Sequence, residues 1–229
     1  MLTLCKGRTG APAWFRAALL CVLLAACAVL SASASDEDGY VTCGSAIKLQ
    51  HLGTRHRLHS HEVAYGSGSG QQSVTGFPDG DDSNSLWTVR PPLGGSCAQG
   101  AKVADGQLVR LQHLGTGRWL HSHNHRSPLS SQQEVSCYGG EGTSNSNDNW
   151  RVQTKDGTPF WERDTVVNFH HADTGVYLAM TNRQFPRPIE GQHEVAGVPR
   201  KSGEADFRAA EGIYFPPATD ESGGKRDEL

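Results

Sequence analysis

Stretches in which apolar and polar residues alternate recur three times along the chain. Apolar side chains at every second position predict a β-strand with one buried face. Each stretch leads through a Gly-Thr or Asp-Thr turn into a second apolar run, so each pair predicts a β-hairpin. The first runs are residues 47–51, 109–113 and 167–171, and the second runs are anchored by Leu58, Leu120 and Leu178.

Two further strand-like segments follow each predicted hairpin. The third segments are residues 72–74, 133–135 and 193–195, and the fourth are residues 87–89, 150–152 and 207–209. Loops rich in Gly, Ser, Asn and Asp separate them, as turn chemistry favours. One of these, the GSGSG run at 66–70, is predicted to be a flexible surface loop.

A 14-residue motif occurs in two closely similar copies and a third, more divergent copy. Residues 48–61 read KLQHLGTRHRLHSH, residues 110–123 read RLQHLGTGRWLHSH, and residues 168–181 read NFHHADTGVYLAMT. A four-stranded unit of about 60 residues cannot bury its apolar face alone, so the copies must share one core.

Three copies of four strands predict an all-β fold, a β-trefoil with a six-stranded barrel capped by hairpins. We expect two layers of core residues, one from each set of equivalent positions. They are Leu49, Leu111 and Phe169 in one layer, and Trp87, Trp150 and Phe207 in the other.

Both ends of the chain carry targeting signals. A basic start, an apolar run at 17–30 and the small residues Ala32-Ser33-Ala34 are typical of a signal peptide over 1–34. The run is shorter than the ~20 residues that a membrane span needs, and we expect no transmembrane segment. The last four residues, Arg226, Asp227, Glu228 and Leu229, resemble the KDEL tetrapeptide that the KDEL receptor retrieves. Together these signals predict the endoplasmic reticulum lumen, a folded domain over 35–215 and a flexible tail over 216–229.

The charge excludes one class of partner. Without the three basic residues of the leader, the chain carries 18 Lys and Arg against 24 Asp and Glu. No basic stripe with interleaved aromatic residues is present, so nucleic-acid binding is not expected.

Three cysteines follow the leader into an oxidising compartment. Cys43 opens the first repeat and Cys97 precedes the second, so closure of the repeats can bring them together as a disulfide. Cys137 is then the odd cysteine, and the plainest interpretation is a free thiol that packs. The chain has no C-x-x-C motif, which argues against a disulfide-exchange enzyme.

Two His-x-His pairs are the sharpest local motif. His59 with His61, and His121 with His123, share a strand face, and His125 is a conceivable third metal ligand. No Cys, Asp or Glu recurs beside both pairs in the sequence. The pattern therefore favours hydrogen bonds across the hairpins, and we predict neither a metal nor a cofactor.

Enzyme motifs are incomplete. GSGSG has glycine where a nucleophilic elbow has serine. Asp79, Asp81 and Asp82 lack the rest of a calcium loop and are predicted to form a solvated acidic loop. We expect no catalytic residue and no enzymatic activity.

These motifs carry a family resemblance. The runs LGTRHRLHSH and LGTGRWLHSH, then QQSVTG and QQEVSC, then SNSLW and NDNW resemble MIR repeats. Such repeats occur in protein O-mannosyltransferases and in inositol trisphosphate and ryanodine receptors. Within that family, the order of motifs over 41–215 between the two targeting signals is similar to the stromal cell-derived factor 2 group. The resemblance implies a trefoil with repeats at about 41–98, 103–157 and 161–215.

The resemblance also implies a function. It suggests a chaperone accessory in folding quality control, which associates with a luminal J-domain co-chaperone and Hsp70 and keeps misfolded client proteins soluble. The alternative is a carbohydrate-binding module for mannose. Trp119 and Tyr177 occupy equivalent positions in the second and third copies and would then be the stacking aromatics. With the four histidines of the pairs, they complete the candidate binding surface.

Overall fold

The computed structural model describes residues 39–155 and 157–217. These residues form twelve β-strands and three short 3-10 helices, which confirms the predicted all-β trefoil. Among them, no helix has the length and apolar character to cross a membrane. The predicted signal peptide and the Arg226 to Leu229 tetrapeptide lie outside the described residues.

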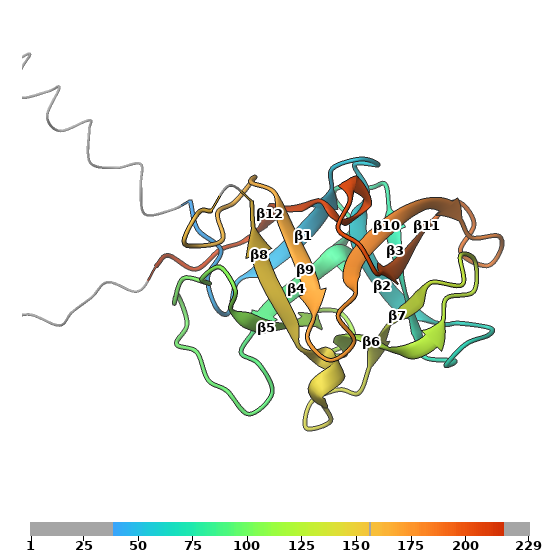
Figure 1. The fold of residues 1–229 in the computed structure, drawn as a ribbon, viewed down its shortest axis with the longest axis horizontal. Helices are drawn as coiled ribbons and strands as arrows, with labels where there is room; N and C mark the ends of the chain where they lie inside the picture. Colours follow the sequence, from blue (N-terminus) through green and yellow to red (C-terminus); the bar gives the residue numbers. More distant parts are fainter. Residues whose placement is uncertain (1–38, 156, 218–229) are drawn as a thin grey trace, which may run out of the picture. The chain divides into compact units, whose positions relative to one another are not determined.

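Six strands form a closed barrel (Figure 1). They are β1 (Ala46–His51), β4 (Leu86–Arg90), β5 (Leu108–His113), β8 (Trp150–Thr154), β9 (Val167–His171) and β12 (Phe207–Ile213). The antiparallel pairings run in this order around the ring, and β12 pairs back with β1. Closing the ring removes the free edges that an open sheet exposes.

The other six strands form three hairpins that cap one end of the barrel. They are β2 (Arg57–Ala64) with β3 (Gln72–Phe77), β6 (Trp119–Arg126) with β7 (Gln133–Tyr138), and β10 (Tyr177–Gln184) with β11 (His193–Val198). The inner strands β3, β7 and β11 also pair with one another. Thus the main hairpins join the second and third strands of each repeat, whereas the sequence suggested the first and second. The first and second strands share a single paired position in each repeat, because the second strand turns away into the cap.

A ring of backbone hydrogen bonds closes the opposite end of the barrel. The amide of Val41 donates to Trp161 (2.8 Å), that of Trp161 to Val103 (2.8 Å), and that of Val103 to Val41 (3.1 Å). All three side chains are buried. The first residues of the three repeats therefore plug the barrel in a cyclic arrangement.

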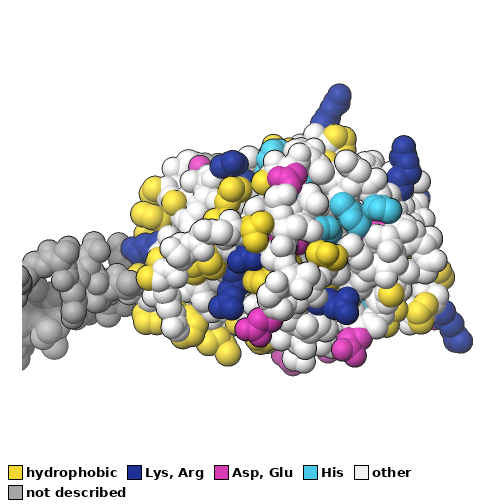
Figure 2. Space-filling view, turned by 90° about the horizontal axis from the view of Figure 1, so that it is seen from below, with side chains coloured by type: hydrophobic (Ala, Val, Ile, Leu, Met, Phe, Trp, Pro, Cys, Tyr) yellow, Lys and Arg dark blue, Asp and Glu magenta, His cyan; other side chains and the backbone are white. Residues whose placement is uncertain are grey.

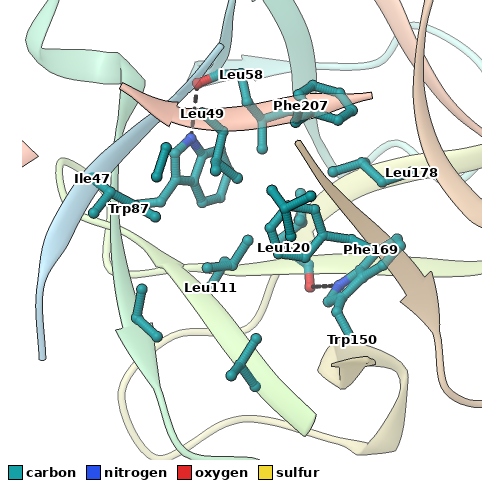
Figure 3. Packing of buried hydrophobic residues seen from close by; sticks show 14 of the residues in the cluster. Ile47, Leu49, Leu58, Trp87, Leu111, Leu120, Trp150, Phe169, Leu178 and Phe207 are labelled. Carbon is teal, nitrogen blue, oxygen red and sulfur yellow. Dashed lines mark hydrogen bonds between the residues drawn. The ribbon is translucent and has the colours of Figure 1, made fainter. Parts of the chain in front are cut away.

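The two predicted core triads lie together in one buried cluster (Figure 3). All six residues, Leu49, Leu111, Phe169, Trp87, Trp150 and Phe207, are 0% exposed. The indole N–H of Trp87 donates to Leu58 O (2.8 Å), and that of Trp150 donates to Leu120 O (3.0 Å). A buried indole needs such a partner. The third repeat has Phe207 at this position and so has no N–H to satisfy.

Candidate functional site

The first histidine pair is bound to a short 3-10 helix. His59 of β2 places Nδ1 2.7 Å from Asp82 Oδ2 and Nε2 3.2 Å from His61 Nδ1. Asp82 immediately precedes η1 (Ser83–Ser85) and also accepts from the Ser85 hydroxyl at 2.8 Å. Burial lowers the pKa of His59, and Asp82 opposes this only in part. Burial raises the pKa of Asp82, but hydrogen bonds from Ser85 and His59 outweigh it and hold that pKa below its ordinary value.

The second pair is anchored in the same way from a different position. His121 of β6 places Nδ1 2.8 Å from Oδ1 of Asp148, the last residue of η2 (Ser146–Asp148). The other Asp148 oxygen accepts from the Ser144 hydroxyl (2.6 Å) and from the Asn145 amide (2.8 Å). Both oxygens of the carboxylate therefore have partners, and the residue is fully buried.

These contacts correct two expectations. A carboxylate does stand beside each pair, although none recurs in sequence register. The two carboxylates contact His59 and His121 from the turn before the fourth strand of each repeat. The hydrogen bonds were expected to cross the hairpin instead. Asp82 is consequently part of this network and is not a residue of a solvated acidic loop.

The third repeat replaces the pair with two small residues. Ala179 stands where the first two repeats have His59 and His121, and Ala205 of η3 (Gly203–Ala205) stands where the second has Asp148. Both alanines are 0% exposed and pack in one small apolar cluster. The histidine-carboxylate contact is thus a link between cap and barrel that an apolar contact can replace.

The hairpin histidines His123 and His125 lie beyond the anchored ring of His121. Nε2 of His123 is 3.2 Å from Glu134 Oε1, and the His123 and His125 rings are 4.5 Å apart. In the residues that the structure describes, no group of three or more His, Cys, Asp or Glu side chains is arranged to hold a metal ion.

Buried Glu134 fixes the loop that the sequence suggested to be flexible. Ser69 of the GSGSG run donates both its amide (3.1 Å) and its hydroxyl to this carboxylate. Gly68 adopts φ +73°, and a Cβ on it would stand 2.1 Å from Glu134 Oε2. The loop of the first repeat is therefore tied to the second repeat. In the same manner, Glu194 accepts hydrogen bonds from the Ser127 hydroxyl and the Ser130 amide of the second repeat.

The two candidate stacking aromatics are only partly available. Trp119 is 6% exposed, its indole N–H donates to Gly140 O (3.1 Å), and the Arg110 guanidinium lies 4.1 Å from the ring centroid. Tyr177 is half-buried beside the His170 ring at 4.8 Å. His59 and His121 are 3% and 2% exposed. Three of the six candidate surface residues thus lie beneath the surface.

The cysteines have separate roles. Cys43 and Cys97 form a disulfide with Cα atoms 6.3 Å apart, which ties the β4–β5 connection to the start of the first repeat. Cys137 is free and buried. Burial raises its pKa to about 12, so its thiolate is scarce at neutral pH. Its equivalents Gly76 and Gly197 leave no room for a side chain, since an added Cβ would meet a neighbouring atom at 2.5 Å in each case.

A threefold histidine motif was missed by the sequence analysis. His51, His113 and His171 end the first strand of each repeat. Each accepts from the amide of the Thr three residues on, at 3.1 to 3.2 Å, through Nδ1. Each Nε2 then donates to a carbonyl of another repeat's 3-10 helix, at 2.8 to 3.2 Å. The recurring His-x-x-Thr spacing was the available signal. Burial lowers the pKa of all three, so they link the repeats as neutral rings.

The surface gives no sign of a nucleic-acid site on the face seen in Figure 2. Lys and Arg side chains there are scattered among apolar and polar ones and do not form a continuous stripe. An electrostatic footprint for a phosphate backbone requires such a stripe.

Comparisons with known proteins agree with this geometry. The family model described as "MIR domain" matches residues 59–207. Stromal cell-derived factor 2-like protein 1 of Bos taurus is 44% identical over 98% of this chain and 98% of its own length. The crystal structure of the SDF2-like protein from Arabidopsis thaliana has 47% identity and a TM-score of 0.76, covering 78% of this chain and 98% of that one.

An enzyme complex contains a similar domain. The S. cerevisiae protein O-mannosyltransferase Pmt1-Pmt2 complex, solved with its sugar donor, matches with 30% identity and a TM-score of 0.67. The match covers 82% of this chain but 29% of that one. The trefoil is thus a module that also occurs inside a larger protein.

Proposed function

Because the chain belongs to the MIR-domain family of stromal cell-derived factor 2 proteins, we propose that it is a non-enzymatic chaperone accessory of the endoplasmic reticulum lumen. In this role it associates with a luminal J-domain co-chaperone and Hsp70 and helps keep misfolded client proteins soluble. The observation that carries the proposal is the 44 to 50% identity with these proteins over most of the chain.

The two ends of the sequence support the compartment. A signal-peptide pattern at 1–34 and the terminal tetrapeptide Arg226 to Leu229 are what entry to the lumen and retrieval by the KDEL receptor require. Removing the tetrapeptide should send the protein into the culture medium. Retention without it would contradict this part of the proposal.

The non-enzymatic role is supported by how the reactive side chains are used. Ser69, Glu134 and His123 lie together, but the serine hydroxyl donates to the carboxylate and the histidine contacts the same carboxylate. In a hydrolytic triad the histidine stands between the serine and the acid. The free thiol of Cys137 is held protonated by burial. Ser69 therefore has a structural partner, and neither its hydroxyl nor the Cys137 thiol is activated as a nucleophile.

An apolar groove at the hairpin tips supports contact with unfolded clients. Tyr65, Phe185 and Ile189 form a small cluster with Val63 and Leu129, beside a cavity of about 230 Å³. A cavity of this size suits an apolar side chain of an extended peptide, since pockets lined mainly by apolar groups bind such groups.

Affinity purification from luminal extract, followed by cross-linking mass spectrometry, tests the proposal. It should recover a J-domain protein and Hsp70; recovery of neither would overturn it. Leu129→Ser, at the partly buried edge of the groove, should weaken protection of a reduced client against aggregation. Leu114→Ser, at a leucine that is 52% exposed and outside the groove, is the matched control and should change nothing.

The alternative is a mannose-binding module, favoured by the similar domain in the mannosyltransferase complex. Stacking of a sugar on Trp119 would require Arg110 to leave the face that it covers, so this function is less well supported. A glycan array with mannosylated peptides separates the two. A signal that is lost in Trp119→Ala or Tyr177→Ala would favour the carbohydrate module.

A further inference from the structure

A hollow of the described surface lies where the β4–β5 connection meets the second repeat. It has a volume of about 580 Å³ and is walled by the β4–β5 connection, which includes Pro91 and Cys97, and by Arg90, Arg110, Trp119 and Ser144. The Cys43–Cys97 disulfide holds the connection in place. The wall of this pocket is therefore fixed covalently to the start of the fold.

Two arginines stand opposite each other at this pocket. Arg90 of β4 and Arg110 of β5 are direct partners in the antiparallel ladder, where like charges destabilise the pair. Among residues 39–155 and 157–217, none of the ion pairs includes either of them. Two positive charges thus share a pocket without a carboxylate in direct contact.

Arg110 is held in one orientation. Its Nε donates to Pro91 O at 2.8 Å, one terminal nitrogen donates to Ser144 Oγ at 2.7 Å, and its plane covers the Trp119 ring. The other terminal nitrogen has no hydrogen-bond partner within the described part of the chain. Burial, together with the charge of Arg90, lowers the pKa of Arg110, and buried Asp148 behind Ser144 opposes this.

At the equivalent positions of the first repeat, the basic side chains have acceptors or an ion-pair partner. There, Lys48 donates to Gly80 O, and Arg57, which replaces Trp119, is paired with Glu211. The third repeat has the uncharged Asn168 and Tyr177 at these positions. The unpaired double charge is therefore specific to the second repeat and is not required by the fold.

We propose that this pocket binds an oxyanion group, either a carboxylate or a phosphate, between Arg90 and Arg110. An anion there would relieve the repulsion between the two guanidinium groups and use their remaining donors. Arginine favours such ligands because its planar fork matches two oxygens of a carboxylate or phosphate. The proposal does not depend on the chaperone role, so either can fail without the other.

Calorimetric titration of the full-length mature protein with inorganic phosphate and, separately, with succinate tests the proposal. Titration with sodium chloride at equal ionic strength serves as the salt control. Saturable binding of at least one of the two anions is expected. Arg90→Gln removes an exposed side chain that makes no hydrogen bond within the described residues, so folding should be preserved. It should weaken binding about tenfold or more, as the loss of a charge-assisted hydrogen bond does.

Arg187→Gln, at an exposed arginine near the hairpin tips, is the matched control and should bind like the unmodified protein. Binding of phosphate alone would identify a phosphorylated ligand, and binding of succinate alone would identify a carboxylate. Binding of both would identify an unselective oxyanion pocket. Absence of saturable binding for both anions, or equal affinity in Arg90→Gln, would overturn the proposal.

Discussion

His121 and Asp148 form a buried contact of 2.8 Å between the cap and the turn that leads back into the barrel. The third repeat fills the same space with Ala179 and Ala205, both fully buried. One location in the fold therefore accepts either a polar pair or an apolar pair. Removing only one partner of the polar pair should destabilise the fold. The remaining buried polar group would lose its hydration without a hydrogen bond in exchange.

The single variants His121→Ala and Asp148→Ala should each lower the free energy of unfolding by about 3 kcal/mol. The double variant reproduces the alanine pair of the third repeat and should cost less than the sum of the two. Urea denaturation measures all three. His121→Ala combined with Asp82→Ala, which lie in different repeats, is the control and should be additive within about 0.5 kcal/mol. Additivity of the first pair would contradict the coupling.

Gly68 should be intolerant of substitution. Its φ of +73° lies in the left-handed region, and a Cβ would meet Glu134 Oε2 at 2.1 Å and Arg126 O at 3.2 Å. We expect Gly68→Ala to cost about 2 kcal/mol or more, from backbone strain and the displaced carboxylate together. Gly66→Ala, in the same loop but with open space around it, should stay within about 0.5 kcal/mol. Thermal unfolding of the two variants makes the comparison, and equal melting temperatures would refute it.

The strands and the core could be predicted because they repeat. Leu49, Leu111 and Phe169 occupy the same position in three copies, and period-two alternation indicates which face is buried. The carboxylate partners of His59 and His121 could not be predicted from the sequence. Asp82 stands five residues before Trp87, whereas Asp148 stands two before Trp150. One spatial position is filled from two backbone positions of the same turn, so sequence alignment alone cannot show that they are equivalent.

The anchored GSGSG loop was missed for a different reason. Its partner Glu134 lies 65 residues away and belongs to the next repeat. Local composition reports the turn-forming tendency of Gly and Ser correctly but carries no information about a distant acceptor. The burial of His59 and His121 could not be predicted for the same reason: the sequence places them on a strand face, whereas the packing of η1 and η2 beside β2 and β6 is a tertiary contact.

Replacement of Arg55 by glycine should stabilise the fold. It adopts φ +62°, whereas the equivalent residues of the other repeats are Gly117 and Gly175, with φ of +68° and +71°. A left-handed conformation costs a non-glycine residue about 1 to 2 kcal/mol, which the greater flexibility of glycine in the unfolded chain offsets in part. Arg55→Gly should therefore raise the free energy of unfolding by up to about 1 kcal/mol. Gly117→Ala should lower it by a similar amount. A destabilised Arg55→Gly would show that its side chain matters more than its backbone.

The stability of the fold should decrease as the pH falls below about 6.5. Burial lowers the folded-state pKa of His51, His113 and His171 from the ordinary value of 6.5. Above that value neither state binds a proton, so the contribution of each ring is complete. Below it the unfolded chain binds protons that the folded chain does not bind. Each ring then lowers the free energy of unfolding by up to about 1.4 kcal/mol per pH unit, until the pH reaches the pKa of the ring in the folded state.

Urea denaturation at pH 7.5 and pH 5.5 measures this effect within the histidine range. The depressed pKa values of Asp82, Glu134 and Glu211 contribute in a separate window, because their ordinary values are 3.8 and 4.5 and their contributions are lost only as the pH falls below about 4.5. Burial also lowers the pKa values of His56, His59 and His61, which contribute in the same window. His113→Asn should be less stable than the unmodified protein at pH 7.5 but should lose less on acidification, since one of the rings with a lowered pKa no longer titrates. Equal losses in the two proteins would show that His113 is not excluded from protonation, and the neutral link between repeats would then be wrong.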